Sequence, residues 1–202
     1  SSHPHPDHLG GLTALLEDIT VSAFYTCFPE DERRERSVQP AAIKRLKEAG
    51  VPIIGLKDGD LLPFEEVELR VHQQAKAPIL NDASAMLHLR FKKAAMLLTA
   101  DISQGGQRFF SKRKELRADV MKAPHHGIER LQPRFLDAVR PEYVFVTHGS
   151  GDTKGTWGLL RQRKIPHFFV TRGVIHFATD GSRWLAEQIG SSASLEPEES
   201  PQ

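Results

Sequence analysis

The sequence predicts a layered α/β domain. The second half of the chain alternates short apolar segments rich in β-branched residues with segments of helical spacing, and the first half is β-rich with surface helices. With 202 residues, 39% of them hydrophobic, the chain is long enough to bury one core. We expect a single domain over residues 1–190. Residues 191–202, where Ser, Glu and Pro replace apolar residues, are expected to form a disordered acidic tail.

Composition excludes several classes of protein. The 27 basic and 26 acidic residues nearly cancel, so no overall field attracts a polyanion, and nucleic-acid binding would need a local patch. The single cysteine, Cys27, excludes an internal disulfide and a cysteine-based zinc site. No run of about 18 apolar residues is present, so we expect no membrane segment in this chain. Because the chain begins inside a motif, a signal or membrane segment has room upstream.

The first half is expected to begin with a polar histidine-rich loop. A helix follows, on which Leu12, Leu15, Leu16 and Ile19 recur at helical spacing. Further along, we expect strands at 19–28, 51–56 and 67–72, a surface loop at 29–36, a helix at 40–50 and a turn at 58–60. Residues 85–91 and 94–99 are predicted to form a hairpin closed by Lys92 and Lys93.

The second half alternates more regularly. We expect helices at 107–116, 133–139 and 157–164 and strands at 119–123, 143–147, 167–171 and 174–178. This alternation is typical of a sheet covered by helices.

The opening residues carry the strongest chemical signal. Three imidazoles and a carboxylate occupy positions 3, 5, 7 and 8, with prolines at 4 and 6: His3, His5, Asp7 and His8. The prolines are expected to keep the segment out of a helix, so that His3, His5 and Asp7 converge on one side of an extended chain. Imidazole nitrogen with carboxylate oxygen suits zinc or manganese. The alternative, a solvated terminus or a purification-tag fragment, is disfavoured because tags lack the Leu-Gly-Gly and amphipathic helix that follow.

The motif at 3–8 with the Gly-Gly that follows it resembles the signature of the metallo-β-lactamase superfamily. Two later segments resemble that superfamily in the expected order: residues 96–101, a strand ending in Asp101, and residues 119–127, which contain the His125-His126-Gly127 loop. The second segment is similar to one branch, the soluble domain of the DNA-uptake competence protein ComEC and its standalone relatives. Residues 59–60, 81–84 and 139–144 fit the same branch, so the resemblance extends over about residues 1–187.

The resemblance implies an αββα sandwich with two divalent metal ions, Zn or Mn. His3 and His5 would hold one ion, Asp7 and His8 the second, and Asp101 would bridge them. One of His125 and His126 would complete the second site. The sequence does not say which; we assign His125 to the metal and His126 to substrate contact and catalysis, together with Asp7 and Asp101. Substrate-binding residues are expected to include Asn81, Ser84, His126 and His148.

Some positions depart from the superfamily pattern. Asn81 stands where most members have a further histidine, Ile128 where a serine usually follows the His-His-Gly loop, and Ala100 where a glycine usually precedes the bridging aspartate. Members also have several strands before the first motif, so the sandwich is expected to be N-terminally incomplete, with one sheet short of strands and an exposed edge.

The expected reaction is phosphodiester hydrolysis by a water activated between two metal ions, with DNA or another phosphodiester as substrate. One alternative is hydrolysis of a small ester, lactone or thioester on the same site, and another is an inactive metal-binding scaffold. Attachment to a ComEC-type membrane channel would place the domain outside the cytoplasm. A basic cluster could contact phosphates or simply be solvated: Lys112, Arg113, Lys114 and Arg117. Structural roles are expected for the remaining histidines, His72, His88, His167 and His176.

Overall fold

The computed structural model describes residues 1–62, 64–148 and 156–190. Its centre is a seven-stranded sheet in the order β3-β4-β5-β6-β7-β8-β9. The strands are β3 (Leu61–Leu62), β4 (Glu68–His72), β5 (Met86–Phe91), β6 (Ala94–Leu98), β7 (Val120–Lys122), β8 (Tyr143–Val146) and β9 (His167–Phe169). Neighbours from β3 to β6 are antiparallel and those from β6 to β9 are parallel.

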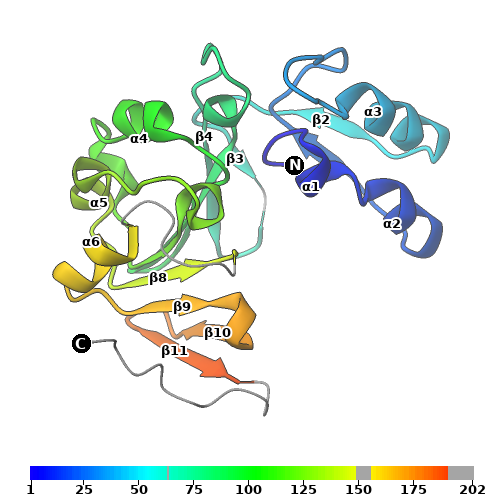
Figure 1. Cartoon of the computed structure of the whole chain (residues 1–202). Helices are drawn as coiled ribbons and strands as arrows, with labels where there is room; N and C mark the ends of the chain where they lie inside the picture. Colours follow the sequence, from blue (N-terminus) through cyan, green and yellow to red (C-terminus); the bar gives the residue numbers. More distant parts are fainter. Residues whose placement is uncertain (63, 149–155, 191–202) are drawn as a thin grey trace.

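Three helices cover one face of this sheet (Figure 1): α4 (Gln104–Phe110), α5 (Pro133–Val139) and α6 (Thr156–Gln162). Side chains from this face of the sheet and from the helices form the main core, with Phe110 and Phe135 completely buried. Burying two aromatic side chains of this size contributes several kcal/mol to stability, by an estimate of about 25 cal/mol per Å². The core therefore fixes α4 and α5 against the ends of β6 and β7.

The N-terminal part lies on the side of β3 and β4 away from α4 to α6 (Figure 1). It contains α1 (Pro6–Leu9), α2 (Leu12–Asp18), β1 (Phe24–Thr26), α3 (Gln39–Glu48) and β2 (Ile53–Gly55). Strands β1 and β2 pair in parallel, and a second core around Leu46 packs α3 against them. The layers are thus helices, a large sheet, a two-stranded sheet and helices, which confirms the predicted αββα class.

A hairpin of β10 (Val174–Thr179) and β11 (Trp184–Ile189) follows β9. Short 3-10 turns include 81–83, 114–116 and 124–127. Across the described residues, no helix is both long and apolar enough to cross a membrane.

Several sequence-based expectations need correction. The prolines do not keep the whole opening motif extended, because Pro6 is the first residue of helix α1, a position where its fixed φ favours a helix. The strand expected at 19–28 is confined to Phe24–Thr26. The helix expected at 107–116 begins earlier, at Gln104, where the Ser103 side chain caps it, and ends at Phe110. Strand β11 was not anticipated, and residues 191–202, expected to be a disordered tail, lie outside the described residues.

Candidate metal centre

The proposed metal ligands reach one place from three parts of the chain. Strands β6 and β7 are parallel neighbours, so their carboxyl ends lie at the same edge of the sheet. Asp101 follows β6, and the His125-His126 loop follows β7. The N-terminal segment is brought to this edge by backbone hydrogen bonds, in which the Ala85 amide donates to the Ser2 carbonyl (2.8 Å) and the Val38 amide to the Pro4 carbonyl (2.8 Å).

Four side chains surround one point, and their ligand atoms all lie within 4.8 Å of one another: Asp7, His8, Asp101 and His126. The Oδ2 atom of Asp101 lies 3.0 Å from His8 Nε2 and 3.2 Å from His126 Nε2, and these two nitrogens are 3.1 Å apart. Asp7 Oδ2 lies 3.6 Å from His8 Nε2 and 3.7 Å from His126 Nε2.

These separations fit a tetrahedral ion. Zinc bonds of about 2.0–2.1 Å to nitrogen and oxygen place neighbouring ligand atoms about 3.3–3.4 Å apart, and five of the separations here run from 3.0 to 3.7 Å. The set is also open on one side, because the Asp7 side chain is 64% exposed while that of Asp101 is 2% exposed. A small molecule can therefore approach from the Asp7 side.

A second group lies beside the first. His3 Nε2 and His125 Nε2 are each 3.9 Å from Asp101 Oδ2, and His5 Nδ1 is 3.2 Å from His3 Nε2. The Asn81 amide nitrogen lies 3.4 Å from His125 Nε2. Three buried atoms of this group, His5 Nε2, Asn81 Oδ1 and His125 Nδ1, have no hydrogen-bond partner within the described residues. Unpartnered nitrogens and oxygens of this kind are satisfied by a cation, and His125 Nδ1 also lies 4.0 Å from Glu129 Oε1. The residues of this group therefore have the donor types for a second ion.

The electrostatics favour a charged Asp101 beside uncharged His3 and His125. Burial opposes ionisation of Asp101, but hydrogen bonds from His126 and His8 and the nearby Lys122 hold its pKa well below its usual value. Burial, reinforced by the neighbouring His8, lowers the pKa of His3 to about 3. Burial also lowers the pKa of His125, against the opposing effect of Asp101. Neutral imidazole with ionised carboxylate is the protonation state that binds divalent ions.

The backbone at the two loops adopts a conformation that side chains rarely allow. Ala100 (φ 48°), His125 (φ 46°) and His126 (φ 56°) all lie in the left-handed region. The His125 amide donates to the Ala100 carbonyl (3.1 Å), which joins the two loops. Consecutive left-handed residues direct the His125 and His126 rings differently, so the two histidines reach different parts of the site.

Hydrogen bonds from behind orient the rings. His126 Nδ1 lies 2.8 Å from Thr147 Oγ1, and Ser2 Oγ lies 3.2 Å from His3 Nδ1 and 3.3 Å from His8 Nδ1. When Nδ1 of a histidine is held by such a partner, Nε2 is left to face a metal. The sequence reasoning missed Thr147 and Ser2. The only available signal was their position next to motif residues, directly after β8 and directly before His3.

The structure places the other sequence-predicted residues as follows. Of the two paired histidines, it brings His126 into the compact four-residue group and His125 near Asn81, whereas the sequence-based assignment gave the metal to His125. Ser84 is completely buried, so a substrate cannot reach its hydroxyl without displacing other atoms. His148 is exposed at the end of the segment that follows β8.

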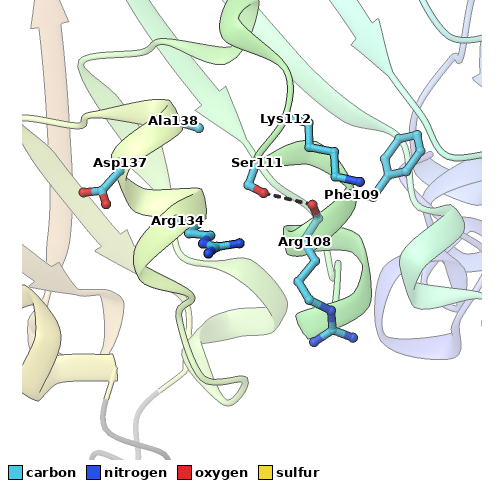
Figure 2. Close-up of a pocket in the computed structure, with 7 residues that line it drawn as sticks. All are labelled: Arg108, Phe109, Ser111, Lys112, Arg134, Asp137 and Ala138. Carbon is cyan, nitrogen blue, oxygen red and sulfur yellow. Dashed lines mark hydrogen bonds between the residues drawn. The ribbon is translucent and has the colours of Figure 1, made fainter.

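The basic cluster contributes to the outer surface of α4 and the turn after it. A groove of about 740 Å³ lies between this segment and α5, lined by Arg108, Lys112 and Arg134 together with the acidic Asp137. Figure 2 shows Arg134 on α5 facing the segment that carries Arg108 and Lys112. Asp137 pairs with Arg163 at 3.3 Å. The groove is therefore a cationic surface outside the metal centre.

Comparison with known proteins identifies the family. The sequence profile of the metallo-beta-lactamase superfamily matches residues 1–148, which include all of the converging histidines and carboxylates. The chain belongs to the metallo-beta-lactamase superfamily. This membership confirms the family predicted from the motifs, and it accounts for a layered fold that carries its polar cluster at the end of the sheets.

The individual relatives of this superfamily member are distant. ComE operon protein 3 of Bacillus subtilis (strain 168) is 24% identical over 160 residues, which cover 75% of this chain but 20% of that protein. Among solved structures, Igni18, a metallo hydrolase from the archaeon Ignicoccus hospitalis KIN4/I, superposes with a TM-score of 0.54 at 11% identity, over 93% of this chain and 78% of that one. The metallo-beta-lactamase fold protein YhfI from Bacillus subtilis gives 0.51 at 15% identity, over 83% and 71%. These likenesses support the fold.

Proposed function

We propose that this metal-dependent hydrolase cleaves phosphodiesters, with DNA as the favoured substrate class. The observation that carries the proposal is the convergence of four imidazole nitrogens on one carboxylate oxygen, Asp101 Oδ2, at distances of 3.0 to 3.9 Å. A single carboxylate oxygen surrounded by four imidazole nitrogens is suited to lie between two cations.

In this proposal Asp7, His8 and His126 hold one ion, and His3 and His5 hold the other, with Asp101 between them. Divalent ions at such a pair lower the pKa of a bound water and stabilise negative charge on the attacked and leaving oxygens. Thr147 orients His126 from behind, and Asp7 provides the solvent-facing side of the site. His125, 3.9 Å from Asp101 Oδ2 and in contact with Asn81, is proposed to complete the His3 side or to face the substrate.

Two observations favour a phosphodiester over a small ester. The motifs resemble the ComEC type of domain, and ComE operon protein 3 matches three quarters of the chain. The groove between α4 and α5 also presents Arg108, Lys112 and Arg134. A guanidinium group can donate two parallel hydrogen bonds to the oxygens of one phosphate. Both helices begin at the edge of the sheet that carries the metal centre, and the groove residues of α4 lie in its last turn and just after it. In the proposal, a polymer long enough to cover both places contacts the groove while its scissile bond lies at the metal centre.

The test begins with metal content and activity. Protein loaded with Mn²⁺ or Zn²⁺ is expected to bind about two ions per chain and to cleave both a phosphodiester chromogen and single-stranded DNA, while Asp101→Asn removes activity on both. Equal cleavage by the wild type and Asp101→Asn would show that another protein is the source. Preferential activity on lactones or thioesters would support the small-ester alternative, and binding of no ions would support the scaffold.

The groove is tested separately. The double substitution Arg108→Glu with Arg134→Glu is expected to raise the KM for DNA and to weaken its salt dependence, without changing cleavage of the small chromogen. The matched control is Lys44→Glu, because Lys44 is an exposed cation on α3, in the N-terminal layer. If the double variant has the same KM for DNA as Lys44→Glu, the groove has no part in DNA binding.

A further inference from the structure

Lys122 is a largely buried cation next to the metal centre that holds no ion in the proposed ligand set. It is the last residue of β7, and its side chain is 13% exposed. Its ammonium group donates to the Ala100 carbonyl (3.0 Å) and to the Ala123 carbonyl (3.3 Å). Ala100 directly precedes Asp101, and Ala123 begins the loop that carries His125 and His126. Lys122 therefore joins the two loops from behind.

The two oxygens of Asp101 have different surroundings. Oδ2 faces the imidazoles, with His8 and His126 at 3.0 and 3.2 Å and His3 and His125 at 3.9 Å. Oδ1 is buried and has no hydrogen-bond partner within the described part of the chain. Its ion-pair contact is Lys122 Nζ, at 3.6 Å.

The donor inventory of lysine links these two facts. An ammonium group has three N–H donors, and two of those of Lys122 are used by the carbonyls of Ala100 and Ala123. The third is available for Asp101 Oδ1, and a shift of a few tenths of an ångström would bring the 3.6 Å contact into hydrogen-bonding range. A fixed cation on that side also repels a second cation that approaches Oδ1.

We propose that Lys122 is a positioning residue that reserves Oδ1 of Asp101 for itself, so that Oδ2 is the oxygen that the carboxylate would offer to divalent ions. This inference rests on the proposed two-metal site and adds which carboxylate oxygen would serve it. Without Lys122, the carboxylate is free to turn and to use both oxygens. The ion that Asp7, His8 and His126 would hold would then bind more weakly.

The test is made on the full chain with Co²⁺, whose absorption spectrum depends on the ligands around the ion. Lys122→Met removes the ammonium group, Lys122→Arg keeps the charge, and Lys44→Met is the control at an exposed lysine. Metal affinity is measured by competition with a chromophoric chelator, and folding of the metal-free protein by circular dichroism.

We expect Lys122→Met to bind the Co²⁺ at Asp7, His8 and His126 about tenfold or more weakly than the wild type does, with an altered absorption spectrum, and the other Co²⁺ with wild-type affinity, since partners behind ligands contribute about 10- to 100-fold to affinity. Lys122→Arg should retain the affinity of the Asp7, His8 and His126 site within about threefold, by the same principle. Should Lys122→Met not fold, Lys122→Gln takes its place, because its amide can still donate to a carbonyl while lacking the charge.

Two results would overturn the inference. One is wild-type affinity for both ions with an unchanged spectrum in the neutral variant. The other is an equal loss of both ions in the neutral and the Arg variants together with a less stable metal-free fold, which would make Lys122 a structural residue only. The proposed function fails separately: a wild type that binds two ions but cleaves no phosphodiester would refute the substrate class and leave the role of Lys122 supported by the binding data.

Discussion

Replacing His88 should change how the stability of the protein depends on pH. His88 lies on β5 with 4% of its surface exposed, and its Nε2 is 3.1 Å from the Arg117 carbonyl. Burial, reinforced by the nearby His72 and Arg90, lowers its pKa to about 4 from 6.5. As the pH falls below 6.5, His88 therefore binds a proton in the unfolded chain while it stays unprotonated in the folded protein.

The sign and size follow from this difference. The contribution of His88 to folding is fully present above pH 6.5 and is lost as the pH falls from 6.5 toward 4. At about 1.36 kcal/mol per pH unit, the gap between the two pKa values amounts to about 3 kcal/mol, of which about 2 kcal/mol would be lost by pH 4.5. This loss is a large part of the free energy of unfolding of a typical domain, which is about 5–15 kcal/mol.

The assay is urea unfolding of metal-free wild type and His88→Gln between pH 7.5 and 4.5, with the free energies of unfolding compared at each pH. We expect the stability advantage of the wild type over the variant to shrink by about 2 kcal/mol across this range. His176→Gln, at an exposed position on β10, serves as the control for loss of an imidazole. A difference between wild type and His88→Gln that stays constant with pH would refute the reasoning.

Three further outcomes are expected. Thr147→Val removes the group 2.8 Å from His126 Nδ1 and should weaken metal binding about tenfold in a chelator competition, with little change in the metal-free fold. Gly127→Ala should lower the unfolding free energy by about 2 kcal/mol or more, because the glycine has φ +86° and a Cβ would lie 2.6 Å from Trp157; Gly11→Ala, where nothing lies within 4 Å, should not. Chelation of bound ions should lower the melting temperature, and adding metal back should restore it. Metal at 100 times its Kd should raise the free energy of unfolding by about 2.7 kcal/mol.

Sequence alone predicts the parts of this fold that depend on local pattern. The hairpin β5–β6 and helix α5 lie where alternation, Pro133 and periodicity place them, because these signals act within a few residues. Strand β11 was missed: it alternates as a half-exposed strand does, and its pairing with β10 is a tertiary choice. The turn at Pro6 was misread because proline excludes a helix interior but suits a first turn.

The candidate site shows the same division. Residue types and spacing in the histidine-rich opening were enough to single out His8, whereas Asp101 was named through the resemblance of residues 96–101 to the metallo-β-lactamase superfamily. Which of His125 and His126 joins the four-residue group depends on two consecutive left-handed backbone conformations, and histidine at these positions does not predict them. Sequence reasoning assigned no role to Thr147 and Lys122, because each contacts a proposed ligand, His126 or Asp101, through a tertiary arrangement that the pairing of the strands creates.

The left-handed conformations of Ala100, His125 and His126 have a thermodynamic consequence. Each such residue costs about 1–2 kcal/mol relative to an ordinary conformation, so the two loops together carry about 3–6 kcal/mol of unfavourable energy. The surrounding core has to supply that amount before any ion is present. Arriving cations thus meet donors that are already aimed and lose little affinity to rearrangement. The same unfavourable energy is released when these loops relax, so weakening the packing beneath them should loosen the site.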